Sequence, residues 1–193
     1  MRCRHCHALI SWQYPLVELV CGLLFWRVAM HLPLYYQGIE MAYLFFVCAA
    51  LIVIFLFDAR HYIIPDRVMI PLVVVSFVHV WWNGAFMLGM YPIWSGLGLS
   101  GFFLLQYVIS RGKWIGFGDV KYGLFMGFFL GFPLVLVGFF FSYLLGAFVG
   151  LFLIMCKKKT LTQHIPFGPF LILGTLIAYF MGHGMIYWYV NLV

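Results

Sequence analysis

Long apolar runs separated by short polar segments dominate this sequence. A helix needs about 20 predominantly apolar residues to cross the hydrocarbon core of a bilayer. Runs of roughly this length predict one membrane-spanning helix each at residues 14–30, 41–57, 68–84, 93–109 and 167–189. The pattern therefore predicts a chain that crosses a membrane several times.

One further apolar run, residues 120–155, is too long for a single crossing. Gly131-Phe132-Pro133 interrupts it, and proline suits the start of a new helix. We therefore expect two spans there, the first of them short. The predicted fold class is all-α, a polytopic transmembrane helical bundle with about seven spans.

Composition agrees with this pattern. The chain is 66% hydrophobic and 8% charged, whereas a soluble domain is about half apolar and a quarter charged. So few charged side chains could not cover the surface of a soluble globule of this size. A water-soluble protein, a disordered chain and a secreted disulfide scaffold are excluded on this ground.

The basic residues gather in alternate polar segments, and this predicts the orientation. With the N-terminus in the cytoplasm, the cytoplasmic segments are residues 1–13, 58–67, 110–121 and 156–165. These segments contain ten of the eleven basic residues: Arg2, Arg4, Arg60, Arg67, Arg111, Lys113, Lys121, Lys157, Lys158 and Lys159. Because basic loops stay on the cytoplasmic side, the net charge of +6 indicates topology and not nucleic-acid binding.

Acidic residues are the best candidates for chemistry. The chain has only five of them, Glu18, Glu40, Asp58, Asp66 and Asp119, and all but Glu40 lie in or beside a predicted span. An aspartate at the centre of a membrane helix costs about 2.5–3.5 kcal/mol on insertion scales, so such a residue is a candidate functional group by default.

Asp58 ends the second predicted span and Asp119 precedes the fifth, so both are expected at the cytoplasmic face. Two facing carboxylates can share one proton, and their mutual repulsion separates the two pKa values of the pair. This provides an acid and a base near neutral pH. Such a pair can activate water against a peptide carbonyl. The glycines Gly116 and Gly118 would let the backbone approach an extended substrate closely.

Two other interpretations of these residues stay open. In the first, Asp119 caps a helix and Asp58 pairs with Arg60. In the second, the two aspartates form the proton relay of a small proton-coupled transporter. No duplication of the kind expected for a transporter is evident in the sequence.

The order of several motifs is more specific than any one of them. They are Phe57-Asp58, Ile64-Pro65-Asp66, Gly116-x-Gly118-Asp119-Val120-Lys121, Pro166-Phe167-Gly168-Pro169-Phe170 and, near the start, Cys3-Arg4-His5-Cys6 and Tyr14-Pro15-Leu16-Val17-Glu18. Over nearly the whole chain, this series resembles the prepilin peptidases, bacterial inner-membrane aspartic peptidases of type IV pili and type II secretion.

The resemblance implies a function and a site. Asp58 and Asp119 would be the catalytic pair, and Gly116, Gly118 and Lys121 would support the substrate or the backbone. Asp66 would be a structural residue that starts a helix, with a role in substrate support left open. The substrate would be a prepilin or pseudopilin whose basic leader is cut after a glycine at the cytoplasmic face of the inner membrane. Membrane lipid is the other expected partner, and a homo-oligomer is left open.

The N-terminal segment departs from the family pattern. Residues 1–13 are expected to be a cytoplasmic segment with a single CxxC, and residues 14–193 the transmembrane peptidase domain. Family members usually have a further N-terminal span and a first CxxC, which this sequence lacks. Cys3 and Cys6 supply two ligands where a structural zinc site needs four, so the zinc site is incomplete.

The peptidase reaction is expected to require no cofactor. The family also methylates the new N-terminus with S-adenosylmethionine, an activity associated with the N-terminal region. For this chain, methylation and its cofactor are left open.

Overall fold

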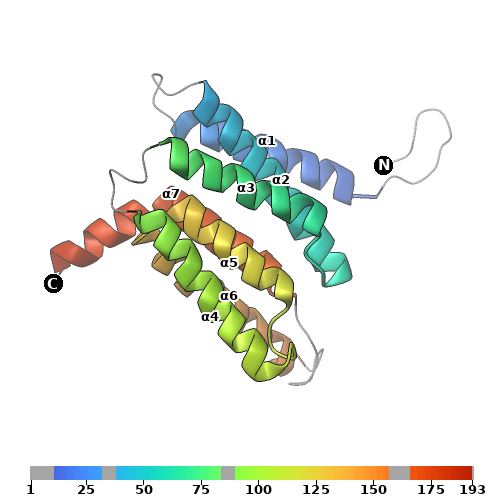
Figure 1. Cartoon of the computed structure of the whole chain (residues 1–193). Coiled ribbons are helices and arrows are strands. Elements are labelled where there is room, and N and C mark those ends of the chain that lie inside the picture. Colours follow the sequence, from blue (N-terminus) through green and yellow to red (C-terminus); the bar gives the residue numbers. More distant parts are fainter. Residues whose placement is uncertain (1–10, 32–37, 84–89, 157–165, 193) are drawn as a thin grey trace, which may run out of the picture. The chain divides into compact units, whose positions relative to one another are not determined.

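The structure is a computed structural model that describes residues 11–31, 38–83, 90–156 and 166–192. Every regular element in these ranges is a helix, which confirms the predicted fold class (Figure 1). The helices are α1 (Gln13–His31), α2 (Ile39–His61), α3 (Asp66–Trp82), α4 (Tyr91–Ser110), α5 (Phe117–Leu130), α6 (Leu134–Met155) and α7 (Gly168–Leu192).

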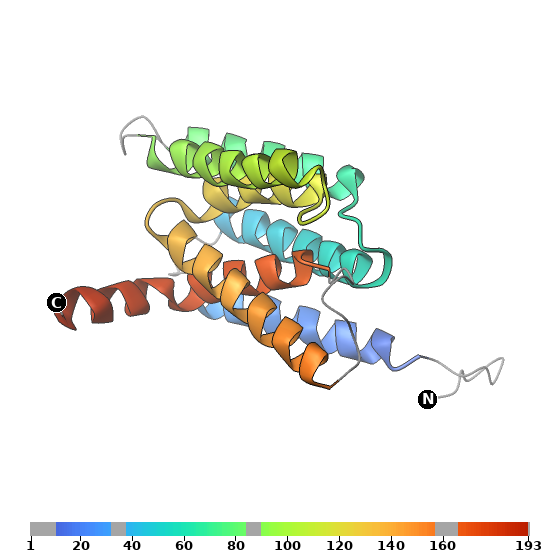
Figure 2. The same cartoon turned by 90° about the horizontal axis from the view of Figure 1, so that it is seen from below.

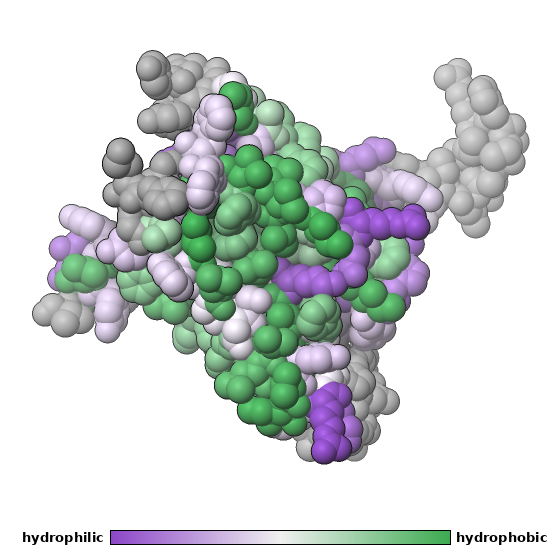
Figure 3. Space-filling view, viewed as in Figure 1, coloured by the Kyte–Doolittle hydropathy of each residue, from purple (hydrophilic) through white to green (hydrophobic). Residues whose placement is uncertain are grey.

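Each predicted span corresponds to one of these helices, and the predicted break at residues 131–133 separates α5 from α6. Four helices, α2, α4, α6 and α7, are long and apolar enough to cross a membrane by length and composition. With 14 residues, α5 is shorter than a full crossing needs, whereas α3, with 17, lies at the lower end of the range for a crossing. The chain is an integral membrane protein whose apolar side chains cover much of the surface drawn in Figure 3.

The chain divides into two compact units, Met1–Val53 and Ile54–Val193. In the first unit, α1 and the first part of α2 pack through aromatic rings. The rings of Phe25 and Phe45 stack with their centroids 4.6 Å apart. The second unit begins within α2 and contains all other helices.

Within the second unit, the short helix α5 is the central element. It contacts α3, α4, α6 and α7 (Figure 1), and most of its side chains are buried. Because neighbouring helices surround it, α5 does not have to face lipid along a full bilayer thickness. Gly131 ends it with a φ of 65°, a conformation that glycine adopts without steric cost.

Two helix pairs in this unit approach closely through small residues. A Cβ atom added to Gly127 of α5 would overlap the backbone of Gly96 in α4. One added to Gly174 of α7 would overlap Ser142 and the carbonyl of Gly138 in α6, which crosses α7 in Figure 2. Small residues let membrane helices pack backbone against backbone, and this packing holds α5 and α7 in place.

Candidate active site

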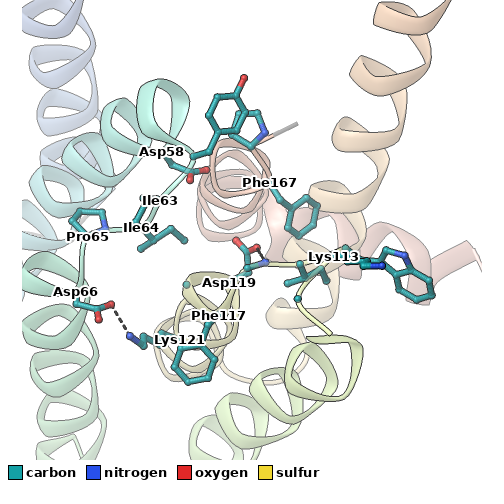
Figure 4. Close-up of a pocket in the computed structure, with 17 residues that line it drawn as sticks. Asp58, Ile63, Ile64, Pro65, Asp66, Lys113, Phe117, Asp119, Lys121 and Phe167 are labelled. Atoms are coloured by element: carbon teal, nitrogen blue, oxygen red, sulfur yellow. Dashed lines mark hydrogen bonds and ion pairs between the residues drawn. The ribbon is translucent and has the colours of Figure 1, made fainter. Parts of the chain in front are cut away.

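A pocket of about 910 Å³ lies where several helix ends of the second unit meet. It is lined by Asp58 at the end of α2, residues 62–66, residues 112–119 at the start of α5, Lys121 and residues 166–167 before α7. The predicted residues Asp58, Asp66, Gly116, Gly118, Asp119 and Lys121 all line this one pocket (Figure 4).

Asp58 lies in the last turn of α2 and is 5% exposed. Its Oδ2 accepts a hydrogen bond of 3.0 Å from the backbone N–H of Gly168, the first residue of α7. Tyr62, four residues after Asp58, follows the helix in a left-handed conformation. Its N–H donates a hydrogen bond of 2.9 Å to the backbone carbonyl of Asp58. In the alternative interpretation Asp58 would pair with Arg60; in the structure its carboxylate is instead bonded to the α7 backbone.

Asp119 lies in the first turn of α5 and is 7% exposed. Its Oδ2 accepts a hydrogen bond of 3.1 Å from the N–H of Gly116, so the side chain caps its own helix. The capping interpretation is thus correct for Asp119, and it leaves the rest of the carboxyl group available to the pocket.

The position of Asp119 also changes its titration. The pKa of this carboxyl is raised to about 7, chiefly by burial; the Gly116 N–H acts to lower the pKa, and the nearby charge of Asp58 acts to raise it. Asp119 precedes the apolar run of α5, at the membrane edge expected from the sequence. A carboxyl group with this pKa can carry a proton near neutral pH.

The two carboxyl groups point toward one another across the pocket (Figure 4). They come from helices that are far apart in the sequence, and each is held by one backbone N–H donated by a glycine. This arrangement leaves oxygen atoms of both groups for a water molecule or a peptide carbonyl. It has the parts needed for acid–base chemistry with a single shared proton.

Asp66 and Lys121 form an ion pair at the edge of the pocket, with Nζ and Oδ1 2.6 Å apart. Asp66 is the first residue of α3, as expected, and Lys121 belongs to α5. Their side chains are 57% and 27% exposed. Such a pair contributes on the order of 0–1 kcal/mol, so it ties α3 to α5 without contributing much stability.

Gly118 has a role that the sequence did not indicate. A Cβ atom at this position would lie 2.8 Å from Cβ of Ile64, a buried residue before α3. The close approach that the structure shows at Gly118 is thus to a side chain of the protein itself, and its approach to a substrate stays a prediction. Ile64 also lines the pocket. Its place in the Ile64-Pro65-Asp66 motif was visible in the sequence, but its contact with Gly118 was not.

Metal ligands are not found among the described residues, where no group of three or more His, Cys, Asp or Glu side chains could hold an ion. Cys3 and Cys6 lie outside the described residues. The incomplete zinc site expected at these two residues therefore stays a prediction.

Known families and proteins match this chain along most of its length. The model of the type IV leader peptidase family matches residues 44–151, and the model of the bacterial peptidase A24 N-terminal domain matches residues 1–32. The first match includes all three aspartates of the pocket, Asp58, Asp66 and Asp119. No solved structure matches the chain.

Several curated relatives are named prepilin leader peptidase/N-methyltransferase. The relative from Aeromonas hydrophila is 32% identical over 98% of this chain, and the one from Aeromonas salmonicida (strain A449) is 32% identical over 100%. The relative from Stutzerimonas stutzeri is 29% identical over 94% of the chain. The chain spans 66%, 66% and 63% of the lengths of these relatives, respectively.

Proposed function

This chain belongs to the type IV leader peptidase family, and from that membership we propose that it is a membrane aspartic endopeptidase. Its substrates are prepilins or pseudopilins, and it removes their basic leader after a glycine. The reaction takes place at the cytoplasmic face of the bacterial inner membrane. The names of the curated relatives support the substrate class.

The observation that carries this proposal is the pair of buried carboxyl groups, Asp58 and Asp119, in one pocket. A proton-coupled transporter would also use paired carboxylates, but the family match favours the peptidase. The pocket lies at helix ends, beside the basic segments 58–67 and 110–121, where a leader held outside the bilayer can reach it.

In the proposed reaction, Asp58 is ionised and Asp119 carries the shared proton. Asp58 removes a proton from a water molecule, whose oxygen forms a bond to the carbonyl carbon of the scissile peptide. Asp119 gives its proton to the carbonyl oxygen. The tetrahedral intermediate then breaks its C–N bond as the proton held by Asp58 passes to the departing nitrogen. One hydroxyl of the intermediate returns its proton to Asp119, which leaves a carboxylic acid and restores the pair to its starting state.

Cleavage of a purified prepilin tests the proposed function. We expect the purified chain, in detergent or liposomes, to release the leader, and mass spectrometry of the products locates the cut after a glycine. A prepilin with its glycine replaced by a large residue is the matched control and should stay intact. No cleavage by the folded protein, or cleavage at unrelated bonds, would contradict the proposal.

The pH dependence of cleavage is expected to be bell-shaped. The pair is active with one proton, so kcat/KM should fall above about pH 7, where Asp119 loses it. It should fall again in acid, when the pair holds two protons. The apparent constants belong to the pair and not to one residue. Initial rates between pH 4 and 9 measure this, and a rate that stays constant from pH 7 to 9 would contradict a protonated Asp119.

Asp66→Asn is expected to retain measurable cleavage, because the exposed ion pair with Lys121 contributes little. We expect kcat/KM to fall by about tenfold or less, since 1 kcal/mol corresponds to roughly a fivefold change. Lys121→Met should give a loss of similar size, and the two losses should not add because both remove the same pair. Loss of all cleavage in a folded Asp66→Asn protein would instead place Asp66 in the reaction.

Methylation of the new N-terminus by this chain stays an open prediction. The relatives' names include N-methyltransferase, and the chain matches the N-terminal family model, but residues 1–10 of that match lie outside the described part of the chain.

A further inference from the structure

The start of α7 directs one backbone donor at Asp58. The first amides of a helix have no partner within the helix. In α7, Pro169 has no N–H, and the N–H groups of Phe170 and Leu171 donate to the carbonyl of Phe167 at 3.0 and 3.2 Å. The remaining donor of this turn is the N–H of Gly168, and it is directed at Asp58.

The residue at position 168 must also be small. Gly168 is buried, and a Cβ atom added to it would lie 2.5 Å from Oδ2 and 3.0 Å from Cγ of Asp58. Contacts between a real Cβ and another heavy atom are essentially never that short. A side chain here would push the Asp58 carboxylate away from the amide that holds it.

The two aspartates differ in how they are held. Asp119 is bound by Gly116 of its own helix cap, three residues earlier in the chain. Asp58 is bound by a residue 110 positions away, on a helix that packs against α5 and α6. The orientation of Asp58 therefore depends on where the rest of the second unit places the start of α7.

We infer that Gly168 is a positioning residue for peptide cleavage, which acts through Asp58. Its N–H fixes one carboxylate oxygen, so that the other faces Asp119 and the attacking water. The absence of a side chain lets the carboxylate lie against the helix start. This inference rests on the proposed peptidase function, because the reaction gives the orientation of Asp58 its consequence.

The test compares two alanine variants on one helix, with a purified prepilin as substrate. Gly168→Ala displaces Asp58, whereas Gly184→Ala, further along α7, adds a Cβ that meets nothing within 4 Å. We expect Gly168→Ala to lower kcat by about 10²-fold, because small misplacements of a reacting group cost that much. KM should change by less than about threefold, since in this inference Gly168 acts through Asp58 and does not itself contact the bound substrate. Gly184→Ala should match the wild type.

A second variant removes the donor without adding a side chain. Replacement of Gly168 by glycolic acid, through nonsense suppression, exchanges the N–H for an ester oxygen. Losing a hydrogen bond to a charged group should lower kcat by about tenfold or more, again with little change in KM. This variant decides the question if Gly168→Ala does not fold.

The outcomes separate this inference from the proposed function. An inactive wild type, or an Asp58→Asn variant that cleaves normally, would refute the peptidase proposal and the inference with it. An active wild type and an inactive Asp58→Asn, combined with normal kcat in either folded Gly168 variant, would refute the inference alone. A change in KM with kcat unaltered, or an equal loss of kcat in Gly184→Ala, would likewise refute the inference.

Discussion

Asp58→Asn and Asp119→Asn are each expected to abolish prepilin cleavage in an ordinary assay. Asparagine keeps the size of the side chain and most of its hydrogen bonding, including acceptance from Gly168 or Gly116. It cannot take up or release the proton that the reaction needs. General acid–base catalysis is worth about 10²–10⁴-fold, and the pair also orients the attacking water, so the full loss should be larger.

The two losses should not add, because the two carboxyl groups act as one unit. The double variant Asp58→Asn/Asp119→Asn should therefore be about as inactive as either single variant. Cleavage is measured with protein shown to be folded by its thermal transition, and Asp66→Asn is the matched control for loss of a carboxylate at the same pocket. If Asp58→Asn cuts normally while Asp66→Asn does not, the pair is wrongly assigned. Normal cleavage by all three variants would remove the aspartic mechanism.

Gly127→Ala is expected to have the largest effect on the fold. A methyl group at this position would overlap the backbone of Ser95 and Gly96 in α4, which cannot move aside as a side chain can. Overpacking costs about 1–3 kcal/mol and occasionally more, and it exceeds the gain of up to about 1 kcal/mol in helix propensity. We expect the thermal midpoint in detergent to fall by several degrees.

The control for this variant lies on the other helix of the same pair. Gly101→Ala, in α4, would add a Cβ atom that meets nothing within 4 Å, so its midpoint should equal or slightly exceed that of the wild type. Because α5 also carries Asp119, Gly127→Ala should lower cleavage per folded molecule as α4 and α5 separate. An unchanged midpoint in Gly127→Ala would show that α4 and α5 are not in close backbone contact.

The helices themselves were largely predictable. Each apolar run became a helix because backbone groups in lipid must be bonded within their own segment, and the break at Gly131 and Pro133 separated α5 from α6 as expected. The central, buried place of α5 was not predictable. Its shortness was visible in the sequence, but the helices that surround it are known only from the packing.

The pocket residues divide in a similar way. Asp58, Asp66 and Asp119 stood out in the sequence because an acidic residue beside an apolar run is costly. The ion pair between Asp66 and Lys121 did not, because its partners are 55 residues apart and either could have faced solvent. The local order of polar and apolar residues does not show which distant residues come into contact.

By itself, the sequence determined that this is a helical membrane protein, where its helices begin and end within a few residues, and which carboxylates its chemistry could use. These properties depend on hydrophobicity and charge, which act locally along the chain. Only the tertiary structure decided that Asp58 is held by Gly168 and that Ile64 fills the space beside Gly118. It also decided that Asp58 and Asp119 share one pocket. Each of these depends on close packing between helices distant in the sequence, where a single methyl group decides whether two backbones can meet.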